Sequence, residues 1–368
     1  MDEHRRPQRP PVQVAFVSDS MPERNGVGAY YADLIAQLDG TCVAARFLCP
    51  GGDTAGGLNF PLPGDATQQV FLPSPREFAR HLRGHPPDVI VVATPGPWGM
   101  LGARWARKLG ARLVFGFHTD YAGVTDLYQG SVLRVLSRGY FRVVDRMLFR
   151  RADHVLANSA AMIEQARGLG ARRVSRIGTL LPRPVLESPD VEPRGQLRQV
   201  LFAGRLAPEK RLYQVLEAAR RLPSIRFVVA GEGPLKDDVD AAARELDNLD
   251  YVGWLDRAGL VARMDESDAL VLPSELESFG NVALEAMGRG RIAVVTETCG
   301  IVNWPELAEH MVVFDLATPL HRVLADLAER PAQARVALSL RAREVARELN
   351  RESLAQWLDL LGVQPVDA

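Results

Sequence analysis

Short apolar runs alternate with stretches of helical period along the whole chain, and this pattern constrains the fold most. Uninterrupted apolar strands between helices are typical of parallel sheets that are buried on both faces. The candidate strands are Val12–Ser18, Val89–Thr94, Arg112–Thr119 and His154–Ser159 in the first half, and Gln199–Gly204, Ile225–Gly231, Ala269–Ser274 and Ile292–Glu297 in the second. Two such series predict an α/β chain with two Rossmann-like, doubly wound domains.

Length and composition agree with a two-domain soluble protein. The 368 residues are too many for one ordinary core. Apolar residues make up 47% of the chain and charged residues 24%, which excludes a disordered class. No apolar run reaches membrane-span length, and none follows the basic N-terminus as a signal peptide requires. Cys42, Cys49 and Cys299 show no metal-ligand spacing, so we expect a reduced, cytoplasmic setting.

The domain boundaries follow from the places where the pattern breaks. We expect a flexible tail at residues 1–11 and an N-terminal domain at 12–183. A Pro-rich, charged stretch without periodicity predicts a linker at 184–197, followed by a C-terminal domain at 198–345. Residues 346–368 should form a C-terminal helix that packs back on the N-terminal domain. The helix proper is expected near Ser353–Leu361, with Trp357 on its apolar side.

The informative residues of the first half follow its strands. Ligands of open parallel sheets bind beyond the carboxyl ends of the strands, and two such domains face each other across a cleft. Gly26 and Gly28 precede a helix, where the backbone can approach a phosphate. Tyr31 occupies the third glycine position of a dinucleotide-binding motif, so the motif is incomplete. A tight turn without a ligand is the alternative. His118 ends the third strand, beside Asp120, and can donate a hydrogen bond or transfer a proton; a structural histidine is the alternative.

The second half carries cations and carboxylates in corresponding places. Arg205 and Lys210 follow its first strand and suit a diphosphate, with a solvated turn as the alternative. Glu277 and Glu285 can each accept from a pair of sugar hydroxyls. Backbone N–H groups at the helix start, Phe279–Asn281, can hold phosphate oxygens between them. Ribose, diphosphate and hexose in that order describe a nucleotide-sugar.

Neither an ATP-type phosphate loop nor a metal site is predicted. The segment AGRLAPEK lacks the glycine that such a loop needs before its lysine. Asp238 and Asp240 form a D-x-D, but they fall on a polar helix, where a solvated face explains them better.

Several segments together resemble a known enzyme family. These are PSELESFGNVALEAMGRG, FAGRLAPEKR and NGVGAYYADL, in the expected order. The chain resembles, over nearly its whole length, the retaining glycosyltransferases of family 4, which have the GT-B fold. PERNGV, TPGPWG and FHTDY are most similar to enzymes that glycosylate membrane lipids, such as sulfoquinovosyl-diacylglycerol synthases and GDP-mannose-dependent lipid mannosyltransferases.

The resemblance implies roles for these residues. The catalytic set would be His118, Glu277, Arg205 and Lys210, and the donor-binding set Gly26, Gly28, Arg205, Lys210, Gly253, Ser278, Phe279, Gly280, Asn281 and Glu285, with Asp120 and Tyr121 on the acceptor side. The N-terminal domain would hold the acceptor and the C-terminal domain a UDP- or GDP-linked hexose. Transfer would proceed with retention and without a metal.

The sequence departs from the family pattern after the paired glutamates. Arg291 and Ile292 replace the usual small residue and proline, and the glycine-rich turn is reduced to Gly300. RIGTLLPRP stands where the family has another motif. We expect these changes to lie close to the donor pocket and to bear on the choice of donor.

A basic stripe is independent of the resemblance. Arginine recurs every fourth residue, at Arg134, Arg138, Arg142, Arg146 and Arg150, with apolar residues between. Residues 1–190 carry 23 Lys and Arg against 17 Asp and Glu, and the remainder carries 21 against 28. A basic amphipathic helix can lie on an anionic membrane. A solvated helix packed on its sheet is the alternative.

The sequence thus predicts a hexosyltransferase that acts from a UDP- or GDP-sugar on a membrane lipid or lipid-linked saccharide. The alternatives are a soluble saccharide or secondary-metabolite acceptor, and a catalytically silent partner or sensor protein. We expect no nucleic-acid partner, and a cytoplasmic protein that is peripheral at the inner face of the membrane.

Overall fold

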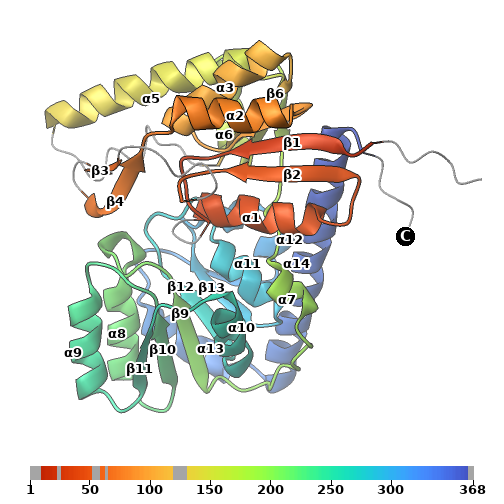
Figure 1. The fold of residues 1–368 in the computed structure, drawn as a ribbon. Coiled ribbons are helices and arrows are strands. Elements are labelled where there is room, and N and C mark those ends of the chain that lie inside the picture. The colour runs from red at the N-terminus through yellow and green to blue at the C-terminus, as the bar shows by residue number, and fades with distance from the viewer. Residues whose placement is uncertain (1–9, 23–25, 52–58, 63–64, 119–130, 364–368) are drawn as a thin grey trace, which may run out of the picture. The chain divides into compact units, whose positions relative to one another are not determined.

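The chain divides into two compact units in a computed structural model that describes residues 10–22, 26–51, 59–62, 65–118 and 131–363. Unit 1 comprises residues 1–180 and 352–368, and unit 2 comprises residues 181–351. Each unit consists of a β-sheet that is covered by helices (Figure 1).

Unit 1 is built on a six-stranded parallel sheet in the order β2-β1-β5-β6-β7-β8. Its strands are β1 (Val12–Val17), β2 (Val43–Leu48), β5 (Val89–Val92), β6 (Arg112–Phe117), β7 (His154–Ala157) and β8 (Val174–Arg176). Its helices are α1 (Gly26–Leu38), α2 (Pro75–Gly84), α3 (Pro97–Leu109), α5 (Ser131–Arg151) and α6 (Ala160–Gly168). An antiparallel hairpin, β3 (Asn59–Leu62) with β4 (Asp65–Phe71), stands outside the sheet.

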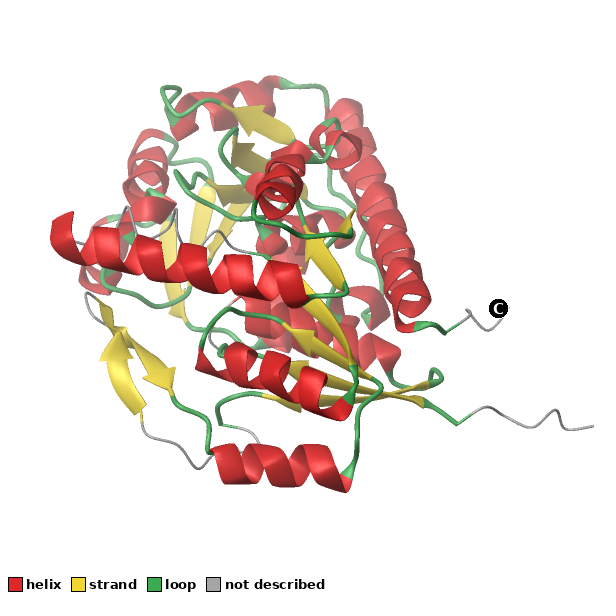
Figure 2. Cartoon of the chain, turned by 90° about the horizontal axis from the view of Figure 1, so that it is seen from above, coloured by secondary structure: helices red, strands yellow, loops and turns green. Residues whose placement is uncertain are grey.

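Two apolar cores cover the faces of this sheet. One face packs against α2, α3, α5 and α6, and the other against α1 (Figures 1 and 2). The last helix, α14 (Ala332–Leu361), belongs to unit 2 up to Arg351 and contributes Trp357 to the second core of unit 1. Trp357 is fully buried and donates a hydrogen bond from Nε1 to the Tyr30 hydroxyl at 2.7 Å. The end of the chain therefore completes the N-terminal unit.

Unit 2 repeats the design with the strand order β11-β10-β9-β12-β13-β14. Its strands are β9 (Gln199–Ala203), β10 (Arg226–Ala230), β11 (Leu249–Gly253), β12 (Ala269–Leu272), β13 (Ile292–Thr296) and β14 (Val312–Phe314). Its helices are α7 (Arg183–Glu187), α8 (Leu212–Arg221), α9 (Lys236–Glu245), α10 (Arg257–Glu266), α11 (Asn281–Gly288), α12 (Pro305–Ala308) and α13 (Leu320–Glu329), with 3-10 turns η1 (Pro208–Lys210) and η2 (Gly300–Asn303). One core contains α7, α10, α11 and α14, and the other contains α8, α9 and α13.

All eight predicted strands are confirmed, and each unit has the predicted Rossmann-like, doubly wound parallel sheet. The missed strands lie at sheet edges, where one side faces solvent. In two of them a charged residue interrupts the apolar run. Residues Val43–Leu48 contain an arginine, and Leu249–Gly253 contain an aspartate. The last helix is also longer than predicted, because it begins at Ala332.

The segment predicted as a linker is fastened to unit 2 by buried arginines. It contains the short helix α7. Arg289, 1% exposed, donates to the carbonyls of Val185, Ser188 and Pro189 and pairs with Asp265 at 2.8 Å. Arginine suits this role because its planar fork satisfies several acceptors at once.

We predict that Arg289→Met lowers the free energy of unfolding by about 3 kcal/mol, because it leaves a carboxylate and three carbonyls without their donor. Urea denaturation measures the loss. The control is Arg341→Met, which removes an exposed pair with Glu344 and should cost less than about 1 kcal/mol. Equal, small losses in the two variants would show that the buried arginine does not fasten the segment.

Candidate active site

Two cation–carboxylate pairs lie beyond the carboxyl ends of strands of unit 2. Lys210, at the end of η1 after β9, forms an ion pair with Glu277, which follows β12. The two side chains are 17% and 20% exposed, and the residues are 67 positions apart in the chain. Parallel strands end at the same edge of a sheet, so the fold brings these predicted residues together. The backbone supports the contact, because Glu275 N–H donates to the Glu209 carbonyl at 2.8 Å.

The second pair joins Glu285 of α11 to Arg257 at the start of α10. Arg257 Nη1 lies 2.8 Å from Glu285 Oε1. Burial raises the pKa of Glu285 above its ordinary value, and the Arg257 charge and hydrogen bond oppose that rise. Sequence reasoning missed Arg257. Its signal was its place, a short distance beyond the predicted Gly253, which ends the strand Leu249–Gly253.

The remaining cation of the predicted set, Arg205, lies one residue beyond Gly204 at the end of β9. Its side chain is 29% exposed, and Nη1 lies 3.9 Å from the Glu209 carboxylate. Because Glu209 precedes Lys210 directly, the turn carries Arg205, Glu209 and Lys210 in one short stretch. Both predicted diphosphate cations therefore lie on the same turn.

The loop before α11 is shaped by close packing. Gly280 caps the helix with φ of 100°, a left-handed conformation that favours glycine, and a Cβ there would lie 2.8 Å from Cys299 Sγ. The Phe279 ring is buried against Trp304, with centroids 6.3 Å apart. Phe279 can therefore offer a ligand only its backbone. Asn281 opens α11, and the N–H groups of Ala283 and Leu284 donate to the carbonyl of the cap residue Gly280 at 2.9 and 3.3 Å.

The reduced glycine turn is the partner of this loop. Gly300 N–H donates to the Glu277 carbonyl at 2.9 Å, and a Cβ at Gly300 would lie 2.0 Å from the Ser278 carbonyl oxygen. Ile301 N–H donates to the Phe279 carbonyl at 2.7 Å. Gly300, the glycine that remains of this turn, therefore lies where the backbone of the turn contacts the backbone of the loop at Glu277 and Ser278.

The expectation that Arg291 and Ile292 lie close to the donor pocket is wrong. Ile292 is the first residue of β13, at the amino end of the strand. The buried Arg291 guanidinium donates to the carbonyls of Val191 at 2.6 Å and Ser267 at 3.2 Å. The paired glutamates lie past the opposite, carboxyl end of the sheet, so this departure serves the fastening of the 185–191 segment instead.

In unit 1, the predicted His118 lies against α1. Its Nε2 is 2.8 Å from the Tyr31 hydroxyl, and its ring centroid is 4.8 Å from that of Tyr30. Burial lowers the pKa of His118 to about 4, so the ring is neutral at physiological pH. Gly28 lies in the first turn of α1, where a Cβ would meet the Met21 carbonyl oxygen at 2.3 Å, and Gly26 begins the helix. Asp120 and Tyr121 lie outside the described residues.

A partly buried aspartate that the sequence analysis missed follows β1. Asp19 accepts from the Thr94 hydroxyl at 2.7 Å and from the backbone N–H groups of Trp98 at 2.8 Å and Gly99 at 3.3 Å. Burial raises its pKa, and these hydrogen bonds act in the opposite direction. Asp19 thus caps the start of α3 and orders the TPGPWG turn.

Within the described part of the chain, no group of three or more His, Cys, Asp or Glu side chains is placed to hold a metal ion. Asp240 of the D-x-D pairs with Lys236 at 3.0 Å on α9, as a solvated face predicts.

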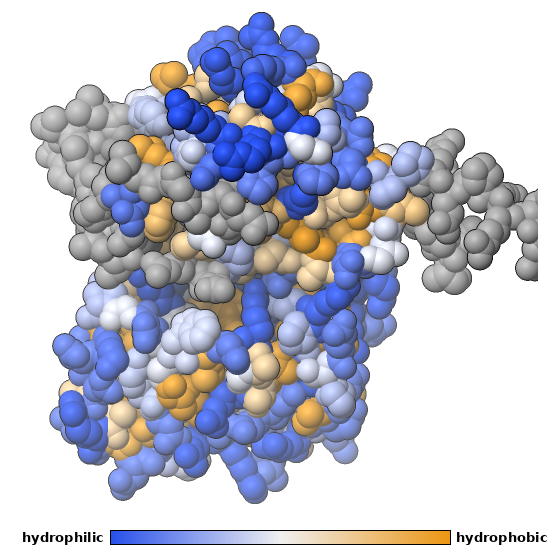
Figure 3. Space-filling model, in the orientation of Figure 1, coloured by the Kyte–Doolittle hydropathy of each residue, from blue (hydrophilic) through white to orange (hydrophobic). Residues whose placement is uncertain are grey.

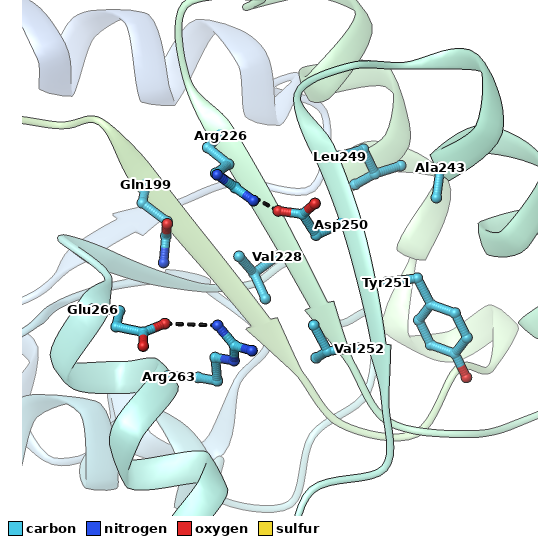
Figure 4. Close-up of a pocket in the computed structure, with 10 residues that line it drawn as sticks. All are labelled: Gln199, Arg226, Val228, Ala243, Leu249, Asp250, Tyr251, Val252, Arg263 and Glu266. Carbon is cyan, nitrogen blue, oxygen red and sulfur yellow. Dashed lines mark hydrogen bonds and ion pairs between the residues drawn. The ribbon is translucent and has the colours of Figure 1, made fainter.

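A separate cavity of about 470 Å³ lies on unit 2 beside β10, β11 and α10 (Figure 4). Its walls carry two ion pairs, Arg226 with Asp250 and Arg263 with Glu266. Val252 lines it, but the predicted donor-binding residue Gly253 does not. The cavity therefore does not coincide with the cation–carboxylate site.

Comparison with known proteins identifies the family. The family described as Glycosyltransferase Family 4 matches residues 24–179, and the one described as Glycosyl transferases group 1 matches residues 187–319. The two matches together cover most of the chain. The chain belongs to the glycosyltransferases. Its paired glutamates, Arg205 and Lys210 lie in the group 1 part, and His118 lies in the family 4 part.

Curated relatives of this glycosyltransferase include three transferases. A GDP-mannose-dependent alpha-mannosyltransferase of Mycolicibacterium smegmatis is 32% identical over 62% of this chain and 60% of its own length. The protein of that name from Mycobacterium tuberculosis is 28% identical over 78% and 80%. A sulfoquinovosyl transferase of Arabidopsis thaliana is 25% identical over 68% and 51%. The matches thus span between about half and four-fifths of these relatives.

Solved structures share the fold at low identity. Sucrose-phosphate synthase from Thermosynechococcus elongatus aligns with a TM-score of 0.69 at 17% identity, over 95% of this chain and 98% of the other. A glycosyltransferase involved in lipopolysaccharide biosynthesis aligns with a TM-score of 0.65 at 16% identity, over 94% and 99%. These likenesses extend the GT-B assignment to nearly the full chain.

We predict that Glu285→Gln stabilises the protein near pH 7, because burial disfavours the charged carboxylate more than the Arg257 charge and hydrogen bond favour it. The raised pKa means that the folded protein holds the proton more tightly than the unfolded chain does. That stability is present in acid and is lost as the pH rises through the raised pKa, above the ordinary 4.5.

The gain of Glu285→Gln should therefore shrink below pH 4.5, as urea denaturation at several pH values measures. Glu245→Gln, at a carboxylate that is 67% exposed, is the control and should change little at any pH. A Gln variant that is less stable than the parent at pH 7 would contradict the account.

Proposed function

We propose that this glycosyltransferase moves a hexose, with retention of anomeric configuration, from a nucleotide diphosphate sugar to an acceptor. The observation that carries the proposal is the pair of cation–carboxylate contacts, Lys210 with Glu277 and Arg257 with Glu285, flanking the start of α11. Three curated relatives, two of them compared above, are named for their dependence on GDP-mannose, which makes GDP-mannose the first donor to test.

The charges assign the parts of such a donor. The diphosphate would bind Lys210, Arg205 and the backbone N–H groups at the start of α11, where the helix end favours anions. Lys210 is already paired with Glu277, so the diphosphate would compete with that carboxylate. A released Glu277 would then accept from hexose hydroxyls. Glu285, which pairs with Arg257, would accept from the ribose hydroxyls.

The reaction would break the bond between the anomeric carbon and the phosphate oxygen. The electron pair leaves with the nucleoside diphosphate, and the acceptor oxygen forms the new bond on the same face of the sugar. The acceptor proton passes to the leaving phosphate oxygen. Fixed positive charge at Arg205 and Lys210 would stabilise the negative charge that develops on the leaving group. In many enzymes, preorganised stabilisation of this kind lowers the reaction barrier more than any other single effect.

A lipid acceptor is supported by the surface of α5. The described arginines Arg142, Arg146 and Arg150 are exposed, as are Tyr140 at 48% and Val143 at 69%. Arginines beside an exposed aromatic and an aliphatic residue suit an anionic lipid surface. The side chains of Arg134 and Arg138 lie outside the described residues. No described helix is long and apolar enough to span a bilayer. In Figure 3, apolar residues form scattered spots on the visible face of unit 2.

A soluble saccharide acceptor is the second candidate. It is favoured by a glycogen synthase of Mycobacterium tuberculosis that is 31% identical over 50% of this chain and 46% of its own length. A catalytically silent protein is less well supported. The departure at Arg291 serves the fastening of the 185–191 segment, and the ion pairs of Lys210 with Glu277 and of Arg257 with Glu285 speak for a charged site.

We predict that GDP raises the thermal midpoint of the protein more than UDP does, because three relatives are named for their dependence on GDP-mannose. A ligand that binds only the folded state stabilises that state. At a concentration of 100 times Kd the gain is about 2.7 kcal/mol. Lys210→Met should abolish most of this shift. Lys236→Met is the matched control, since Lys236 pairs with Asp240 on the exposed face of α9. If GDP still raises the thermal midpoint of Lys210→Met by the same amount, the diphosphate does not bind at Lys210.

We predict that Arg142→Glu with Arg146→Glu weakens binding to vesicles of anionic lipid at least ten-fold, since each basic residue near such a surface contributes about 1 kcal/mol. Cosedimentation measures the binding. The control, Arg76→Glu with Arg80→Glu on α2, reverses two exposed arginines at the same spacing and should leave binding within two-fold. Equal binding by all three proteins would favour the soluble acceptor.

A further inference from the structure

The His118 ring is enclosed by two tyrosines from one turn of α1. Tyr31 meets it edge-on with centroids 5.3 Å apart, and Tyr30 lies at 4.8 Å. The close approach of Tyr31 depends on Gly116, inside β6. A Cβ there would lie 2.0 Å from the Tyr31 hydroxyl and 2.7 Å from His118 Nε2. A glycine within a strand often marks such a contact.

The direction of the hydrogen bond follows from the burial of Tyr31. The side chain is fully buried, and burial raises the pKa of its hydroxyl well above the ordinary 10, so the oxygen keeps its proton. A buried hydroxyl proton needs an acceptor. Among the described residues the structure gives Tyr31 a single hydrogen-bond partner, His118 Nε2 at 2.8 Å. Tyr31 therefore donates, and Nε2 accepts.

We propose that Tyr31 fixes His118 as the neutral tautomer with its proton on Nδ1, so that His118 presents a constant hydrogen-bond donor and does not transfer a proton. Tyr31 is thus a positioning residue. Taking that donor to serve the transferred sugar rests on the proposed function; the tautomer itself does not.

The neutral state of the ring supports this assignment. Burial lowers the pKa of His118 to about 4, so the imidazolium form is absent at neutral pH. Protonation would also place a hydrogen on Nε2, where the Tyr31 hydrogen now points. A general acid or base needs a pKa near the working pH, and this ring does not have one.

The tyrosines are held by the end of the chain. Tyr30 accepts the 2.7 Å hydrogen bond from Trp357 Nε1, and the Tyr31 and Trp357 rings contact with centroids 6.1 Å apart. All of these residues belong to unit 1. Tyr30 therefore supplies a matched control. Its hydroxyl is bonded to Trp357 and not to His118.

The test reads the tautomer directly from long-range proton–nitrogen correlations in protein labelled with ¹⁵N-histidine. His118 is one of seven histidines, so a His118→Gln spectrum identifies its signals. We expect the pattern of an Nδ1-protonated ring that stays unchanged from pH 5.5 to 8. An Nε2-protonated His118 ring in the parent protein, or a titration midpoint near 6.5 there, would by itself overturn the proposal.

The variants separate positioning from a general loss of packing. Tyr31→Phe removes the donor and should convert His118 to a mixture of tautomers or to the Nε2-protonated form. Tyr30→Phe should leave the tautomer unchanged while lowering Tm. An unchanged His118 spectrum in Tyr31→Phe would overturn the proposal.

Kinetics supply the second readout. In the parent, kcat/KM should be flat over pH 5.5–8, because the ring does not titrate there. Tyr31→Phe should lower it by up to about 100-fold, since misplacement of a group that contacts the substrate can cost about that factor. A bell-shaped profile with a limb lost in His118→Gln would identify a proton-transfer role and overturn the proposal. If no sugar transfer is found, the proposed function fails while the spectra still decide the tautomer.

Discussion

The Lys210–Glu277 ion pair is the interaction on which the functional account depends. It joins the turn after β9 to the loop after β12 and leaves both side chains only one-sixth to one-fifth exposed. At such a site, mutual attraction is stronger than on an open surface, yet each charge has lost much of its hydration. In the proposed function, the diphosphate of the donor would offer more negative charge than one carboxylate and would displace Glu277 from Lys210. The ion pair would then hold the two loops together until the donor binds.

Packing determines where these charges stand. Gly280 and Gly300 allow the loop of Ser278 and the turn of Cys299 to touch through their backbones, and the Phe279 ring anchors the loop in the core. On the other unit, Gly116 lets Tyr31 reach His118. At each place a missing side chain permits a polar contact. The functional groups are thus positioned by close backbone approach within rigid parallel sheets, which gives precise geometry.

The sequence predicted the parts of the fold that depend on local pattern. Buried central strands such as Ala269–Leu272 are continuous apolar runs and were recognised; edge strands such as Leu249–Gly253 carry charge and were missed. The candidate site followed from strand-end residues, so Lys210 and Glu277 were both identified. Arg257 was not, because its partner Glu285 is 28 residues away and no spacing rule links them. Arg291 was misplaced for a related reason. A motif comparison shows that a residue differs but not at which end of a strand its side chain lies.

The most direct test of the central claim is calorimetric titration of the parent, Glu277→Gln and Lys210→Met with the nucleoside diphosphate alone and with its hexose conjugate. If Glu277 competes for Lys210, Glu277→Gln should bind the bare diphosphate several-fold more tightly. The same variant should lose that advantage with the sugar conjugate, where the carboxylate is needed for hydroxyls, and Lys210→Met should weaken both ligands. Equal weakening of both ligands by Glu277→Gln would contradict the account.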